Sequence, residues 1–195
     1  MLGNTNAKIG GITGIGLINT CNIGNLTNNN GIFSGFNDSN YLLSSMTTTS
    51  SFTTLKIIIK ANSSSFNTHN TLLGKFSYST WEPWVGVQNN GYPSFYTGNW
   101  IQGTTILNVN TNYWFCIDFD GTYYNYYTLE DNNYTLNNLP SLNNWIYQCK
   151  TDDNFLNSIL YIGKDRWGDG EYWKGNIDLK QSCIVLDGIV KPYYI

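Results

Sequence analysis

Two pairs of acidic residues in this sequence have a spacing that could support the hydrolysis of a glycosidic bond. Glycosidic bond cleavage needs an acid facing a nucleophile or base, and two side chains on one strand share a face when they lie two residues apart. Asp118 and Asp120 have this spacing, but Asp120 also begins an Asp-Gly turn. Asp169 and Glu171 have it inside a glycine-rich loop, where strand alternation need not hold. His69 is the only histidine, and no serine or cysteine nucleophile motif accompanies it. We therefore expect no catalytic residues and no enzyme activity.

Aromatic side chains in turn-rich segments suggest a different chemistry. A sugar ring binds by stacking its C–H face on Trp or Tyr, while placed polar groups bind its hydroxyls. Such aromatics fall in two regions, 81–100 and 164–173, and they are Trp81, Trp84, Tyr92, Tyr96, Trp100, Trp167 and Trp173. Because β-sandwich cores are also built from Trp and Tyr, core packing is the alternative for each one. We predict that at least one of them lies in a glycan-binding surface.

The second region also contains an acidic loop, residues 164–171. Asp165, Asp169 and Glu171 place three carboxylates close together, and calcium prefers such oxygen ligands. The spacing matches no fixed calcium motif, and Lys164 and Arg166 offer the acids an alternative as ion-pair partners. A calcium site and a solvated loop thus remain two interpretations, and no other cofactor is expected.

Composition narrows the classes of protein. The chain has 195 residues, of which 16% are aromatic and 12% charged, so it can bury the core of one large β domain. The net charge of -3 argues against a nucleic-acid partner, which would require clustered Lys and Arg. No apolar run is long enough to span a bilayer, and the start of the chain does not resemble a signal peptide. Four widely spaced cysteines favour free thiols over a zinc site or disulfide framework.

Short strands separated by turn residues must position all of these side chains. Residues 55–60 and 113–119 have strand patterns, and Asp120-Gly121 and Asp187-Gly188 each lie between two strand-like runs. Asp-Gly in this position is a strong hairpin signal, and Asn90-Gly91 suggests a third turn. No helix of useful length is expected. The pattern predicts an all-β sandwich or barrel.

Segments along most of the chain resemble a known family. Residues 35–42, 113–123, 158–164, 172–182 and 184–188 are similar, in this order, to the opening, central hairpin and closing strands of concanavalin A-like lectin/glucanase (laminin-G-like) domains. The form concerned is common in bacteriophage tail and fibre proteins. The resemblance covers roughly residues 31–195 and implies a two-sheet antiparallel jelly-roll sandwich. The Glu-x-Asp-x-Glu motif of the glucanase branch is missing here.

The resemblance also implies a biological setting. We expect a virion structural or receptor-binding protein, a component of a phage head or tail fibre or a decoration protein, with residues 1–30 as an attachment or oligomerisation segment. Its partners would be copies of itself, with a trimer favoured, other virion proteins and a cell-surface glycan. The alternative is a carbohydrate-binding module or adhesin of a bacterial cell surface, and a glycan hydrolase is a third, less favoured hypothesis.

Overall fold

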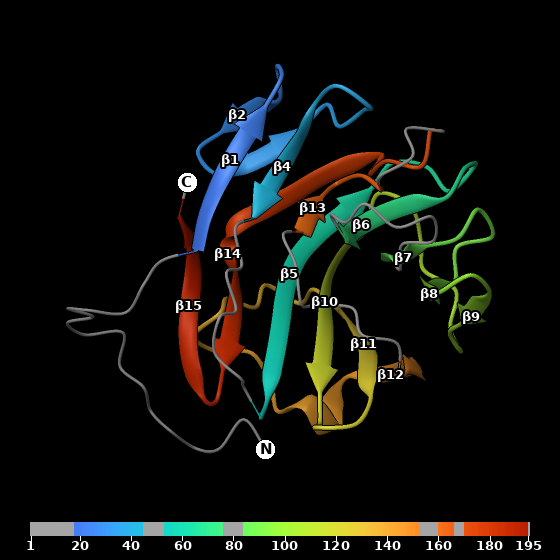
Figure 1. Ribbon diagram of the computed structural model, residues 1–195, viewed down its shortest axis with the longest axis vertical. Coiled ribbons are helices and arrows are strands. Elements are labelled where there is room, and N and C mark those ends of the chain that lie inside the picture. The colour runs from blue at the N-terminus through green and yellow to red at the C-terminus, as the bar shows by residue number, and fades with distance from the viewer. Residues whose placement is uncertain (1–17, 45–52, 76–83, 153–159, 166–169, 195) are drawn as a thin grey trace.

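The described part of the molecule is built from β-strands. The computed structural model describes residues 18–44, 53–75, 84–152, 160–165 and 170–194. Within these ranges the only helical element is a short 3-10 turn, Leu142–Asn144, and no helix is long and apolar enough to cross a membrane. The strands form two sheets (Figure 1). The expected all-β, two-sheet antiparallel sandwich is confirmed.

The first sheet contains the long strands. In spatial order these are β12 (Ile146–Thr151), β11 (Tyr124–Glu130), β10 (Asn112–Phe119), β5 (Leu55–Ser63), β14 (Gly175–Leu186) and β15 (Ile189–Tyr194). Two short strands lie beside the first half of β14, namely β3 (Ile32–Ser34) and its neighbour β2 (Thr27–Asn29). All of these pairings are antiparallel.

The second sheet faces the first. In spatial order its strands are β1 (Ile18–Ile23), β4 (Tyr41–Ser44), β13 (Leu160–Ile162), β6 (Asn70–Lys75), β7 (Trp84–Val87), β8 (Pro93–Tyr96) and β9 (Trp100–Gln102). At one edge the two sheets are joined by a short parallel pairing of β1 with β15. At the other edge the loop after β9 is tied to β12, because the Thr104 hydroxyl donates to the carbonyl of Tyr147.

Turn residues connect the strands where the sequence predicts. Asp120-Gly121 links β10 to β11, and Asp187-Gly188 links β14 to β15. Asp187 and Gly188 both have positive φ, 46° and 81°, as a type I′ hairpin turn requires. Gly91 lies in the turn between β7 and β8 with φ 84°. All three predicted hairpin turns are confirmed.

The main core lies between the sheets. Alternate residues of β5, including Ile57 and Ile59, face Val85, Phe95 and other apolar side chains of the second sheet in one buried cluster. Since successive side chains of a strand point to opposite faces, the remaining residues of β5 point outward. Lys56 and Lys60, four residues apart on the strand, share this outer face.

The outer face of the first sheet carries a second, smaller core, which is called the outer core below. Ile58, Trp114 and Cys183 are buried there beneath partly buried residues of the segment 134–142. Two ion pairs flank this cluster, Lys56 with Asp118 and Lys60 with Asp131. The long strands are therefore covered on both faces for part of their length, which explains their high content of aromatic and branched residues.

The predicted boundary at residue 30 does not coincide with a break in the sheets. β1 pairs with β4 over four residues, from Thr20 opposite Ser44 to Ile23 opposite Tyr41, and β2 pairs with β3. Residues from Ile18 onward are therefore part of the sandwich, because their backbone groups complete its hydrogen-bonded ladders. Residues 1–17 lie outside the described residues, and their role as an attachment segment stays a prediction.

The cysteines are free thiols, as predicted. Cys21 is exposed, whereas Cys116, Cys149 and Cys183 are buried in separate strands. Burial raises the pKa of Cys149 and of Cys183 to about 12, because desolvation disfavours the thiolate. These buried thiols are therefore protonated at neutral pH and behave as small apolar side chains.

Candidate functional site

An aromatic cluster lies where β7, β8 and β9 run side by side. Trp84 is directly opposite Tyr96, and Tyr96 is directly opposite Trp100, so the three side chains share one face of the sheet. Trp84 and Tyr96 stack with ring centroids 6.0 Å apart, and Trp84 and Trp100 meet edge-on at 4.8 Å. The strand register thus brings three predicted site residues together.

His69, which precedes β6, completes the aromatic cluster. Its ring stacks on Trp100 with centroids 4.4 Å apart and planes inclined by 28°. Its Nδ1 accepts a hydrogen bond from the Asn89 backbone N–H at 3.3 Å, and its Nε2 lies 3.9 Å from Glu171 Oε1. His69 is therefore held from two sides and fixes the position of the Trp100 ring.

Exposure increases along the row of aromatic residues. Trp84 is buried with 4% of its surface exposed, Tyr96 is half-buried, and Trp100 is 37% exposed. Trp84 acts as the anchor, because it packs into the sheet, while Trp100 offers apolar ring surface to solvent. The surrounding side chains are polar, since Asn90 and Gln102 are exposed and hydrogen-bonded to each other at 3.4 Å. Such a surface can bind a ring that has an apolar face and hydroxyls at its edge.

The other predicted aromatic site residues have different surroundings. Tyr92 is half-buried in the β7–β8 turn and makes no ring contact with the aromatic cluster among the described residues. Trp81 and Trp167 lie outside the described residues. Trp173 is only 1% exposed, and its indole N–H donates to the Asn62 carbonyl at 2.7 Å. It also packs edge-on against Phe115, so it presents no open ring face for stacking.

The acidic loop is only partly described. Asp165 is buried, Glu171 is half-buried beside His69, and Asp169 lies outside the described residues. Lys164, which the sequence offers as an ion-pair partner, instead donates to the Asp38 carbonyl at 3.0 Å and lies over the Tyr41 ring. The part of the loop that is described contains no group of three metal-ligating side chains. The calcium site stays a prediction.

The Asp118 and Asp120 pair has a structural explanation. Asp118 forms an ion pair with Lys56. Asp120 Oδ1 accepts the backbone N–H groups of Tyr123 and Thr122, and these bonds, with one from Asn125, lower the pKa of its carboxyl below 3.8. Asp118 therefore connects β10 to β5, and Asp120 stabilises the β10–β11 turn.

Sequence comparison found no similarity, whereas comparison with solved structures did. No protein-family model matches the sequence, and no curated protein matches it. Domain 4 of AbnA, a GH43 extracellular arabinanase from Geobacillus stearothermophilus, solved in complex with arabinotriose, superposes with a TM-score of 0.51 at 10% identity, over 82% of this chain and 70% of that one. Domains LG4-5 of the mouse laminin α1 chain superpose with a TM-score of 0.51 at 12% identity, over 79% of this chain and 40% of that one.

These similarities establish the architecture. The fold is a concanavalin A-like jelly roll. At such low identities the agreement concerns the fold alone, which hosts many unrelated functions. The sequence resemblance to this jelly roll is therefore confirmed at the level of the fold.

Sequence reasoning missed the contribution of His69. As a single histidine without a nucleophile motif it has no role in the sequence, and its position in the chain gives no sign that it meets Trp100. The register of Trp84 and Tyr96, in contrast, follows from centring a hairpin near Asn90-Gly91.

Proposed function

We propose that the protein is a non-enzymatic, lectin-like domain that binds glycans through its aromatic cluster. The observation that carries this proposal is the row of Trp84, Tyr96 and Trp100 across three neighbouring strands, which ends in the exposed ring of Trp100. The similarity of the fold to a domain solved with arabinotriose supports the same interpretation.

The chemistry of the surface suits a sugar. A pyranose or furanose ring would stack its C–H face against Trp100, whose position is fixed in advance by His69 and Trp84. Exposed amides at Asn90 and Gln102 offer both donors and acceptors to hydroxyl groups. Because the aromatic rings are already held by one another, binding orders few side chains and loses little conformational entropy.

Glycan binding is tested by a glycan array followed by titration calorimetry on the best ligand, with arabinotriose included among the sugars. We expect Trp100→Ala to weaken binding by at least about tenfold, because it removes the stacking surface. Tyr123→Ala, which removes a half-buried ring beside the distant β10–β11 turn, serves as the control and should bind like wild type. Equal affinity for wild type and Trp100→Ala would contradict the proposal.

The absence of catalysis is part of the proposal. The engagement of Asp118 with Lys56 and of Asp120 with its own turn supports it, since neither carboxylate is placed for acid–base chemistry. Prolonged incubation of the protein with every bound oligosaccharide should release no product. Turnover that disappears in Asp169→Asn would instead support a glycan hydrolase.

For the biological setting we infer a virion structural or receptor-binding protein, and the phage-type sequence resemblance supports this. The alternative is a carbohydrate-binding module or adhesin of a bacterial cell surface. An antibody against the purified protein distinguishes the two, because it should label isolated particles in the first case and bacterial surfaces in the second.

A further inference from the structure

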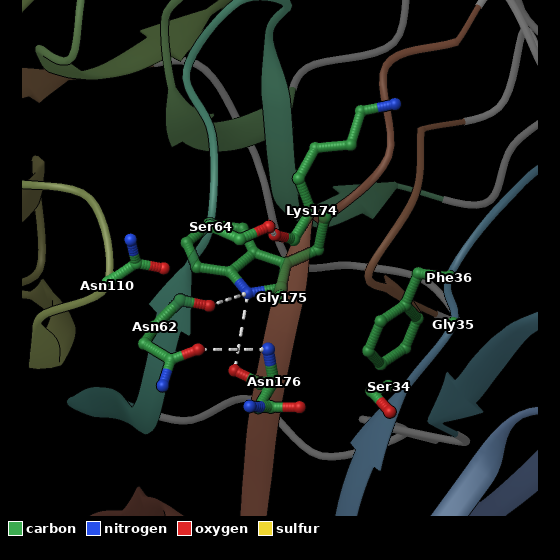
Figure 2. Close-up of a pocket in the computed structure, with 10 residues that line it drawn as sticks. Ser34, Gly35, Phe36, Asn62, Ser64, Asn110, Lys174, Gly175 and Asn176 are labelled. Atoms are coloured by element: carbon green, nitrogen blue, oxygen red, sulfur yellow. Dashed lines mark hydrogen bonds between the residues drawn. The ribbon is translucent and has the colours of Figure 1, made fainter.

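A polar pocket lies beside the beginning of β14, where β5 and β3 flank it. Its volume is about 450 Å³. Figure 2 shows the side chains of Asn62, Asn110 and Asn176 on one side of this pocket and Phe36 on the other. Ser34 and Ser64 add hydroxyl groups to the lining, and the buried Trp173 adds apolar surface. The pocket therefore combines apolar walls with several amides and hydroxyls.

One of the three amides is fixed by the protein. Asn62 Oδ1 accepts the backbone N–H of Asn176 at 3.2 Å, and its Nδ2 donates to Asn112 Oδ1 at 2.9 Å. The indole N–H of Trp173 adds a bond to the Asn62 carbonyl on the same segment. These contacts make a rigid wall, because they connect β5 to β14 through both side-chain and backbone atoms.

The other two amides have unused hydrogen-bonding capacity. Within the described ranges, the side-chain amides of Asn110 and Asn176 have no hydrogen-bond partner, and both residues are exposed. Each amide offers two donors and one acceptor oxygen. A bound molecule with adjacent hydroxyl groups would satisfy them.

The lining carries little charge. No acidic residue is among the lining residues, and the one basic residue is Lys174. Its ammonium group lies 3.4 Å from the centroid of the Tyr172 ring, and Figure 2 shows its side chain extending away from the asparagines. A carboxylate would therefore gain a cationic partner only if Lys174 left the Tyr172 ring, whereas an uncharged polyol finds matching donors and acceptors directly.

A buried asparagine connects this pocket to the aromatic cluster. Asn70 Oδ1 accepts the backbone N–H of Lys174 at 3.0 Å and the Ser63 hydroxyl at 2.9 Å. Asn70 directly follows His69, whose Nε2 lies near Glu171. The pocket and the aromatic cluster thus belong to the same part of the sandwich and are linked by two short segments, 63–70 and 171–174.

We propose that this pocket is a second saccharide-binding subsite, which takes an uncharged sugar residue. The inference rests on the proposed glycan-binding function and adds to it a separate location and a class of ligand. Neutral sugars should enter the pocket, and uronic or sialic acids should not, because their carboxylates would lose water while Lys174 stays on the Tyr172 ring.

The test is a ¹⁵N–¹H NMR titration with neutral methyl glycosides and neutral short oligosaccharides, with the matching uronic acids as the charged comparison. Signals of the Asn110 and Asn176 side-chain amides report on the pocket, and the Trp100 indole N–H reports on the aromatic cluster. We expect both sets to shift with neutral sugars. The double variant Asn110→Gly and Asn176→Ala, followed through the side-chain amide of the lining residue Asn62, should weaken binding at the pocket by about tenfold and leave the Trp100 shift in place.

A matched control separates loss of the amide from a change in backbone. Asn110 has φ 58°, a left-handed conformation that glycine also adopts, and Asn133 has φ 62° at an exposed position that is not part of the pocket lining. The Asn133→Gly variant should therefore show the same sugar-induced shifts of the pocket amides as the wild type.

Each outcome decides the proposal. Saturating shifts at Trp100 without shifts at the pocket amides would overturn the subsite and leave the aromatic cluster as the binding site. Shifts at the pocket alone would support the subsite and contradict binding by the aromatic cluster. Shifts at neither location would overturn both, and equal pocket shifts with the uronic acids would overturn the stated selectivity.

Discussion

Trp100 differs from the other tryptophans of the described chain in what it contributes to the fold. The remaining four, at positions 84, 114, 145 and 173, are at most 6% exposed, so their burial stabilises the sandwich. Trp100 is stacked by His69 on a short edge strand and keeps more than a third of its surface in solvent. Trp100 therefore contributes less to the core than the other four, and its open ring is the part of the aromatic cluster that a ligand can reach.

Asp131 provides a prediction about pH dependence. Burial raises the pKa of this carboxyl, but hydrogen bonds from Lys60 and the Trp114 indole outweigh that effect, so its pKa lies below 3.8. A pKa lowered in the folded state gives stability that is present above the unfolded value and lost as pH falls through the folded value. We expect Asp131→Asn to reduce the free energy of unfolding at pH 7 by about 2–3 kcal/mol, the contribution of charge-assisted hydrogen bonds.

The measurement is urea unfolding of wild type and Asp131→Asn at pH 7 and at pH 3. The difference between the two proteins should be smaller at pH 3, because this pH lies below the ordinary pKa of the carboxyl and the unfolded wild type binds a proton there. Asp152→Asn, at an exposed position, is the control and should change neither value. A difference independent of pH would show that the charge of Asp131 does not stabilise the outer core.

At the scale of elements, two glycines have the same backbone conformation but different surroundings. Alanine substitutions at these positions separate the cost of backbone strain from the cost of a steric clash. Gly188 and Gly163 have φ 81° and 84°, so alanine is strained at both. A Cβ on Gly188 would meet no atom within 4 Å, whereas on Gly163 it would lie 2.2 Å from the Phe36 ring. We expect Gly188→Ala to cost about 1 kcal/mol and Gly163→Ala about 1–3 kcal/mol more, since overpacking adds to the strain.

Urea unfolding of both variants measures this difference directly. The double variant Gly163→Ala with Phe36→Leu relieves the clash and should recover part of the stability lost in Gly163→Ala. Equal destabilisation by the two single substitutions would show that the segment around Gly163 shifts to make room, and that β13 and the Phe36 segment are less closely packed than their distances indicate.

The elements that sequence reasoning found are those with local signals. Asp-Gly and Asn-Gly turns specify hairpins, because only a few residue types adopt positive φ at low cost. The pairing of β1 with β15 has no local signal, since its partners are far apart in the chain. The outer core was missed for a similar reason. Segment 134–142 has no strand pattern, and its tyrosine and three leucines meet the cluster around Trp114 only after the sheet has formed.

The candidate site shows the same limit. Trp84, Tyr96 and Trp100 lie in consecutive strands, so their proximity follows from the hairpin order. By its sequence Trp173 is as suited to ligand binding as Trp84 or Trp100. In the structure its indole N–H donates to the carbonyl of Asn62, 111 residues away. Which tryptophan is open and which is buried depends on these distant contacts, and composition carries no information about them.

For the whole molecule, the decisive feature is how the two sheets are joined at β1. This strand pairs with β4 in the second sheet and with β15 in the first, so it closes one side of the sandwich (Figure 1). Leu26, between β1 and β2, is buried in the main core. Removing residues 1–30 would therefore open that edge and expose apolar surface, and removing residues 1–17 would keep every described strand.

The two truncated chains should differ in both stability and oligomeric state. We expect the chain lacking residues 1–17 to keep the thermal midpoint of the full chain and to lose its association into homo-oligomers, a trimer being the favoured state. The chain lacking residues 1–30 should be less stable by several kcal/mol, because it loses two strands and a buried leucine. Circular dichroism melting measures stability, and light scattering after size exclusion measures mass.

If the full chain and the chain lacking residues 1–17 form particles with the same number of subunits, the first 17 residues are not an oligomerisation segment. If both truncations melt like the full chain, β1 does not hold the sheets together, and the stability of the sandwich comes from the core between the long strands alone.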